Sequence, residues 1–196
     1  MKKPNVTIGD MMAQRLLHLR ACQDGIGWIA TRRSESAAWR NCHRGDWMLW
    51  LAAKVEVCPK ILTLAAAGCA RLALPLVPGR RNLARTRIEA AERWAAGRIT
   101  LEHPGLRTRI VVDGGAFDLP ARLAILSAYY ASKCPADTAY AIWGAGACCD
   151  ALACRSMDRP HWKRYRDARA QSADVVRATI PWALVKQGLA RLESSS

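Results

Sequence analysis

The run from Ile61 to Val77 constrains the fold most, because it is apolar on almost every side of a helix. Its length approaches that of a membrane span, but Arg71 lies inside it, Pro75 interrupts it and alanine supplies much of it. We therefore expect no membrane segment but a buried central helix, against which the other helices pack. Pro59 can open this helix, since proline is tolerated in a first helical turn.

Apolar residues recur at helical spacing through most of the chain, and this pattern predicts an all-α protein. Between residues 98 and 119 the pattern fails, and turn residues flank the β-branched run at 110–112, so we expect an irregular or hairpin excursion there. The expected architecture is a single-domain multi-helix bundle or helical stack over 1–193, with a frayed tail at 194–196. The expected helices cover about 7–22, 36–42, 46–57, 59–73, 81–96, 120–132, 135–153, 167–179 and 181–192.

The cysteines indicate a reducing compartment. There are eight of them in 196 residues, and they lie on apolar helical faces in a chain with no secretory segment after Met1. A chain of this length can bury a sizeable core without disulfides or metals. We therefore expect free thiols and a cytoplasmic location.

The segment Arg44-Gly45-Asp46-Trp47 predicts a corner between two helices. Gly45 can take the positive φ that ends one helix, and Asp46 can cap the next. In the second helix Trp47 shares a face with Leu51 and Val55 at four-residue spacing, while Trp50 lies beside it. The two tryptophans are either core residues or, together with Arg44, an exposed anchor of the kind found at interface hot spots.

Charge points to an acidic partner. Lys and Arg number 30 against 16 Asp and Glu, which gives a net charge of +14. Most of the excess is arginine, which binds carboxylates and phosphates bidentately, and the basic residues either form a solvated face or contact an acidic protein or nucleic acid. They gather in three clusters: Arg80, Arg81, Arg85 and Arg87; Arg98, Arg107 and Arg109; and Lys163, Arg164, Arg166 and Arg169. The expected partner-binding residues are Arg44, Trp47, Trp50, Arg80, Arg81, Arg85, Arg87, Lys163, Arg164 and Arg166.

Four blocks carry a resemblance to a known family: Cys42-His43-Arg44-Gly45-Asp46-Trp47-Met48-Leu49-Trp50-Leu51-Ala52; Ala70-Arg71-Leu72-Ala73-Leu74-Pro75; Ile88-Glu89-Ala90-Ala91-Glu92-Arg93-Trp94; and Ala173-Asp174-Val175-Val176-Arg177 with Ile180-Pro181. The chain resembles, over about residues 20–182, the alanine-rich helical immunity proteins of bacteria and phages. The resemblance implies an all-helical fold and a role in blocking another protein, with no catalytic residues to transfer. The chain departs from the family pattern at 98–119.

The candidate chemical motifs are weak. Gly144-Ala145-Gly146 lacks the third glycine of a dinucleotide-binding loop and follows a helical pattern. Cys148, Cys149 and Cys154 with His161 have metal-binding atoms, but they contain no C-x-x-C pair, so buried thiols are the favoured reading. The adjacent Cys42 and His43 diverge on a helix and make a poor catalytic pair. The sequence thus predicts no enzyme, no metal and no cofactor.

Two functions remain. The first is a non-enzymatic protein-binding module, an immunity-type or phage-encoded inhibitor that masks an acidic partner protein through a basic helical surface. The alternative is a nucleic-acid-binding protein whose arginines contact phosphates, although no recognisable DNA- or RNA-reading motif is present. The sequence does not fix the oligomeric state.

Overall fold

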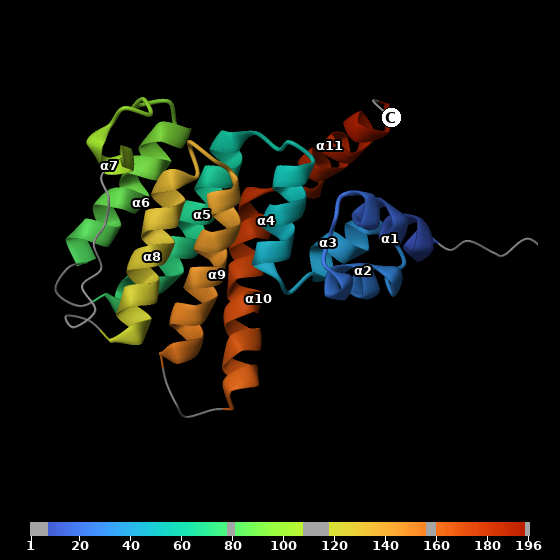
Figure 1. Cartoon of the computed structure of the whole chain (residues 1–196), viewed down its shortest axis with the longest axis horizontal. Helices are drawn as coiled ribbons and strands as arrows, with labels where there is room; N and C mark the ends of the chain where they lie inside the picture. The colour runs from blue at the N-terminus through green and yellow to red at the C-terminus, as the bar shows by residue number, and fades with distance from the viewer. Residues whose placement is uncertain (1–7, 78–80, 108–117, 156–159, 195–196) are drawn as a thin grey trace, which may run out of the picture. The chain divides into compact units, whose positions relative to one another are not determined.

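The structure, a computed structural model, describes residues 8–77, 81–107, 118–155 and 160–194. Helices account for 80% of these residues and none of them forms a strand, which confirms the all-α prediction. The helices fall into two compact units, Met1–Cys42 and His43–Ser196. In Figure 1 the helices of the first unit are blue and those of the second run from blue-green to red. The expectation of a single domain stays a prediction.

The first unit contains α1 (Ile8–His18), α2 (Gln23–Ala30) and α3 (Glu35–Asn41). The predicted first helix is too long: it ends where Arg20 adopts a left-handed φ of 63°, and a new helix starts at Gln23. Ser34 caps α3, because its hydroxyl accepts a hydrogen bond of 3.1 Å from the Ala37 amide. An ion pair of 2.6 Å between Arg15 and Glu35 joins α1 to α3.

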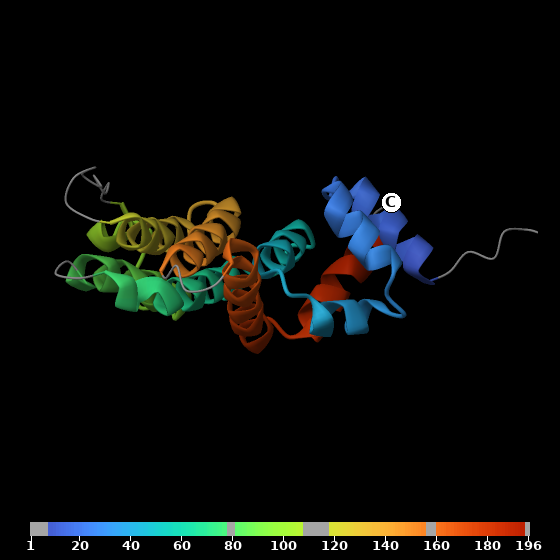
Figure 2. The same cartoon turned by 90° about the horizontal axis from the view of Figure 1, so that it is seen from below.

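The second unit is built around two pairs of helices. The pair α5 (Pro59–Ala73) and α6 (Arg81–Ala95) packs against the pair α8 (Leu119–Lys133) and α9 (Ala139–Cys154), and Figure 2 shows them as two layers. α4 (Gly45–Lys54) and α10 (His161–Thr179) pack against α5 and α9 and extend this core. The other elements are the 3₁₀ turn Leu74–Leu76, α7 (Pro104–Arg107) and α11 (Trp182–Ser194).

The prediction that α5 is the central helix is confirmed, since α4, α6, α8, α9 and α10 all contact it. Pro59 lies in its first turn, where a missing N–H costs nothing. Alanine dominates its buried side, which allows close helix approach; the buried residues are Leu62, Thr63, Ala65, Ala66, Ala67, Cys69, Ala70 and Ala73. Among the described residues, 59–76 is the one stretch whose length and composition would suit a membrane, but half of it is buried inside the protein.

Three predicted boundaries in this unit need correction. α9 begins at Ala139 instead of Pro135, because the chain first makes a turn in which the Asp137 carboxylate accepts a hydrogen bond of 2.9 Å from the Ala139 amide. α10 begins at His161, six residues before the predicted start, with Pro160 at its N-cap. The segment 104–107, predicted as a turn, is the short helix α7 with Leu106 buried. The β-branched run at 110–112 lies outside the described residues.

All eight cysteines are free thiols, and four of them, Cys69, Cys134, Cys148 and Cys149, are buried around α5 and α9. Burial raises the pKa of Cys69 and of Cys134 from 9.0 to about 11, and that of Cys149 to about 12. Burial likewise raises the pKa of Cys148 well above 9.0. The folded protein therefore keeps these thiols protonated at a pH where the unfolded chain loses their protons.

This difference predicts a loss of stability at alkaline pH. The stabilisation is fully present below pH 9, and each such thiol removes up to about 1.4 kcal/mol from the free energy of unfolding for every pH unit between its unfolded and folded pKa. Urea denaturation at several pH values measures the slope, and Cys149→Ala should flatten it. Cys58→Ala, which removes an exposed thiol, is the control. A slope unchanged by Cys149→Ala would contradict the prediction.

Candidate binding surface

The start of α4 differs from the predicted corner. Gly45 is the first residue of the helix and does not have a positive φ, since the described glycine with a positive φ is Gly97. Glycine is needed there for another reason: an added Cβ would clash with the Ser172 side chain and lie 2.8 Å from its backbone carbon in α10. Asp46 is not the N-cap; its carboxylate accepts hydrogen bonds of 2.9 and 2.6 Å from Arg44.

The tryptophans of α4 border its buried face and do not form it. That face consists of Met48, Leu49, Ala52 and Val55. Trp47, Trp50 and Leu51 are half-buried and Val55 is buried, so whether the two tryptophans act as core residues or as an anchor stays open. The Arg44 guanidinium lies 4.3 Å from the centre of the Trp47 ring. Side chains smaller than tryptophan therefore form the buried face of the helix, which packs against α9 and α10.

The first turns of α10 expose a group of aromatic and basic side chains, which we call the α10 patch: His161, Trp162, Tyr165, Arg166 and Arg169. Trp162 is 64% exposed. Arg166 lies 5.6 Å from the Trp162 ring, Arg169 lies 4.2 Å from the Tyr165 ring, and His161 stacks on Tyr165 at 5.8 Å. Cation–π contacts hold the arginines over the rings, so both side-chain types share one surface.

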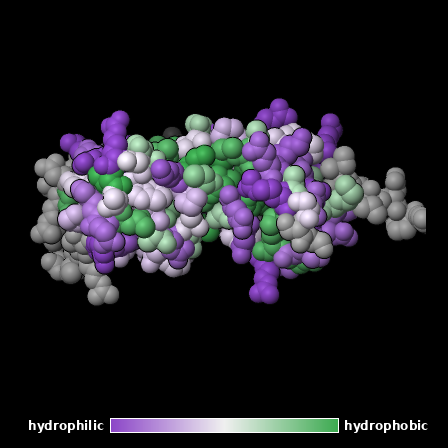
Figure 3. Space-filling view, turned by 90° about the horizontal axis from the view of Figure 1, so that it is seen from above, coloured by the Kyte–Doolittle hydropathy of each residue, from purple (hydrophilic) through white to green (hydrophobic). Residues whose placement is uncertain are grey.

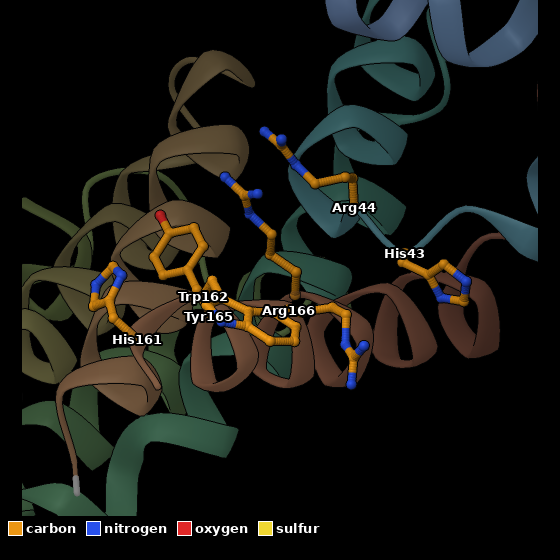
Figure 4. A pocket seen from close by; sticks show the side chains of 7 residues that line it. His43, Arg44, His161, Trp162, Tyr165 and Arg166 are labelled. Carbon is orange, nitrogen blue, oxygen red and sulfur yellow. The ribbon is translucent and has the colours of Figure 1, made fainter. Parts of the chain in front are cut away.

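A cavity of about 310 Å³ lies between the α10 patch and the residues that lead into α4. His43 and Arg44 complete its lining, which otherwise consists of the five residues of the α10 patch. Figure 4 shows the labelled residues of the patch following one another along α10, with His43 and Arg44 coming from the segment before α4. We call this cavity the α4–α10 pocket.

The lining of the α4–α10 pocket is rich in basic side chains. It holds three arginines and two histidines, and among the described residues it includes no carboxylate. Asp46 and Asp167 lie just outside and pair with Arg44 at 2.6 Å and with Arg166 at 3.4 Å. The Tyr165 hydroxyl donates a hydrogen bond of 2.7 Å to Asp150, and burial together with this bond raises the Tyr165 pKa to about 12. Tyr165 is therefore a neutral ring held in one orientation.

Several residues of the predicted partner-binding set meet here and others do not. Arg44 and Arg166 line the pocket, and Trp47 lies under Arg44. Arg164 faces the other way and donates a hydrogen bond of 2.5 Å to the Ala153 carbonyl at the end of α9. Three other residues do not line the pocket: Trp50 and Lys163 are half-buried, and Arg85 is exposed. Arg80 lies outside the described residues, as does Arg109 of the second cluster, and the side chain of Arg81 is not described.

Arg87 is a correction, because it was expected on the binding surface and is only 2% exposed. It lies between α6 and α8, where its guanidinium donates a hydrogen bond of 3.3 Å to Ser132 and sits 5.6 Å from the Tyr129 ring. Burial lowers its pKa. The long aliphatic stem lets an arginine occupy a helix interface, so a charge run in the sequence does not establish exposure.

Sequence reasoning missed His43, Trp162 and Tyr165. The signal for part of the patch was available, because Trp162, Arg166 and Arg169 recur at four- and three-residue spacing, which places them on one face of a helix. It was missed because the predicted helix began at Asp167.

Hydrophilic side chains cover much of the surface that is visible in Figure 3, and hydrophobic patches lie between them.

The other motifs gain no support as chemical sites. Among the described residues, no group of three or more histidines, cysteines and acidic residues is placed to hold a metal ion. Cys148 and Cys149 are buried and Cys154 is half-buried, whereas His161 belongs to the α10 patch. Gly144 packs against α8, 3.5 Å from the Tyr130 Cβ when a Cβ is added, as expected for a close helix crossing. The absence of a metal and of a cofactor stays a prediction.

No protein-family model, curated protein or solved structure matches this chain. The resemblance to immunity proteins therefore stays an expectation from the quoted sequence blocks.

Proposed function

We propose that this protein is a non-enzymatic protein-binding module, an inhibitor of the immunity type that masks an acidic partner protein. The observation that carries the proposal is Trp162, which is 64% exposed on α10 beside Arg166. Tryptophan and arginine side by side are residue types that are enriched at interface hot spots. The surrounding positive charge selects an acidic partner.

The chemistry of the α10 patch suits a protein interface. Tryptophan, tyrosine and arginine are the residue types enriched at hot spots, where each combines a large contact area with a directed polar group. Arg166 and Arg169 are already held over aromatic rings, so less side-chain entropy is lost when a partner carboxylate binds them. An inhibitor requires such a surface and no catalytic group, which agrees with the role implied by the family resemblance.

The test is affinity capture from the native host with matched variants, followed by mass spectrometry and nuclease treatment. The wild type and Arg93→Glu, which alters an exposed arginine on α6 outside the predicted binding set, should retain the same nuclease-resistant partner. Trp162→Ala and Arg166→Glu should lose it, each with a fall in affinity of at least about tenfold, because hot-spot truncations cost about 2 kcal/mol or more. Equal capture by all four proteins would refute the proposal.

A nucleic-acid-binding function is the second candidate, and the same patch favours it. Exposed aromatic rings among arginines stack bases and contact phosphates in single-strand-binding proteins. This function predicts affinity that falls steeply with salt, and Arg166→Gln should reduce the log–log slope by about one. Sub-micromolar binding of single-stranded DNA near 0.15 M salt, tighter than the roughly 10⁻⁴ to 10⁻⁶ M of non-specific contacts, would favour it over the protein partner.

A further inference from the structure

The α4–α10 pocket has the size of a small-molecule site. Its volume of about 310 Å³ lies at the lower end of the range of roughly 300–1,000 Å³ for ligand pockets. Two separate elements form it, the segment before α4 and the first turns of α10, and both belong to the same compact unit. A pocket of this volume holds one small ligand, whereas a protein interface would cover the whole patch around it.

The charge of the pocket specifies an anion with more than two oxygens. Three arginines and two histidines line the pocket, and among the described residues no carboxylate does so. Arg44 forms an ion pair with Asp46 at 2.6 Å. The ion pair between Arg166 and Asp167 is longer, at 3.4 Å. Arg169 lies over the Tyr165 ring and forms no ion pair with another described residue. A carboxylate offers two oxygens and one charge. A phosphate monoester offers three terminal oxygens and a charge of about −1.5 to −2, which matches the larger donor set.

The aromatic rings specify what carries the phosphate. Trp162 and Tyr165 both line the pocket, and the hydrogen bond from Tyr165 to Asp150 fixes the Tyr165 ring before any ligand arrives. Planar bases stack on such rings, and stacking tolerates any base because each has a π face. When a base is joined to a phosphate through a sugar, the base contacts the aromatic rings of the pocket while the phosphate contacts its arginines.

We propose that the α4–α10 pocket binds a nucleoside monophosphate, with the base against Trp162 and the phosphate among Arg44, Arg166 and Arg169. The binding of the nucleotide goes beyond the proposed function and does not depend on it, whereas the effect of the nucleotide on partner access rests on that function. Because Trp162 belongs to both sites, the nucleotide and a protein partner exclude each other from the patch. The nucleotide thereby becomes a ligand that controls access to the masking surface.

Isothermal titration calorimetry of the full chain with adenosine 5′-monophosphate tests the proposal directly. Ribose 5-phosphate, adenosine and inorganic phosphate serve as partial ligands. We expect saturable binding of the nucleotide, at least about tenfold tighter than that of any partial ligand, because stacking and charge-assisted hydrogen bonds each contribute about one order of magnitude. No saturable heat with millimolar nucleotide, or equally tight inorganic phosphate, would overturn it.

Variants at exposed positions separate the pocket from general charge without disturbing the core. Arg166→Gln should weaken nucleotide binding about tenfold, and Trp162→Ala should remove the advantage of the nucleotide over ribose 5-phosphate. Arg93→Gln on α6 is the charge-matched control and should bind like the wild type. A loss with Arg93→Gln equal to that with Arg166→Gln would overturn the proposal. So would a phosphopeptide or a 5′-phosphorylated oligonucleotide that binds more than about tenfold tighter than the free nucleotide.

Discussion

Gly45→Ala should destabilise the second unit by about 3 kcal/mol or more, a cost at the upper end of the range for overpacked cores. The added methyl group would clash with the Ser172 hydroxyl and lie 2.8 Å from the Ser172 backbone carbon. A rotamer change of Ser172 relieves the first contact but not the second, because the second involves the backbone of α10. The two helices must therefore move apart, and the buried contacts around Met48 and Leu49 loosen with them.

Gly146→Ala provides the control with the opposite sign. An added Cβ at Gly146 meets nothing within 4 Å, and the residue lies inside the helix α9. Alanine has the better helix propensity, so this variant should gain about 0.5–1 kcal/mol. Urea denaturation of the purified proteins, followed by circular dichroism, measures both changes. Similar effects of the two substitutions would show that α4 and α10 do not cross as closely as described.

Local signals explain the features that were predicted correctly. Pro59 opens α5, as expected from the tolerance of proline in a first helical turn, and this depends only on residues within a turn of itself. The central position of α5 was also predictable, because a helix that is apolar on nearly all sides has to be buried on all sides. The types and spacing of nearby residues are therefore enough to predict these features.

The errors arise where distant residues decide the outcome. The role of Gly45 depends on Ser172, which is remote in sequence, so local reasoning replaced a helix crossing with a turn. The burial of Arg87 depends on Ser132 and Tyr129 in α8. In both cases the local pattern permitted two structures, and a partner helix selected one of them.

The candidate site was predictable only in part, for the same reason. The excess of arginine indicated an anionic ligand, and Arg44 and Arg166 were named from the sequence. The pocket itself joins residues 43–44 to residues 161–169, and no local pattern connects these segments. α4 and α10 approach each other closely at Gly45 and Ser172, and the pocket residues Arg44 and Arg169 lie within a turn of these two positions in the sequence.

The second large effect concerns the buried face of α4, where Leu49→Ala should cost about 2–5 kcal/mol. Leu49 is 0% exposed and lies between neighbouring helices that cannot fully collapse around the lost side chain. Trp47→Ala removes more atoms, yet it should cost less than Leu49→Ala, because Trp47 is half-buried and the Arg44 guanidinium covers one face of its ring. Thermal unfolding of both variants ranks the two side chains.

The relative loss of stability in the two variants also shows whether Trp47 belongs to the core or to the binding surface. If Trp47→Ala lowers stability less than Leu49→Ala but weakens capture of the partner, Trp47 acts as the support that holds Arg44 beside the α10 patch. Arg44→Lys is then the informative companion, since lysine keeps the charge but loses both the stacking on Trp47 and the two-point contact with Asp46. A cost for Trp47→Ala of about 3–5 kcal/mol, the value for a fully buried aromatic ring, would instead assign Trp47 to the core and exclude it from the binding surface.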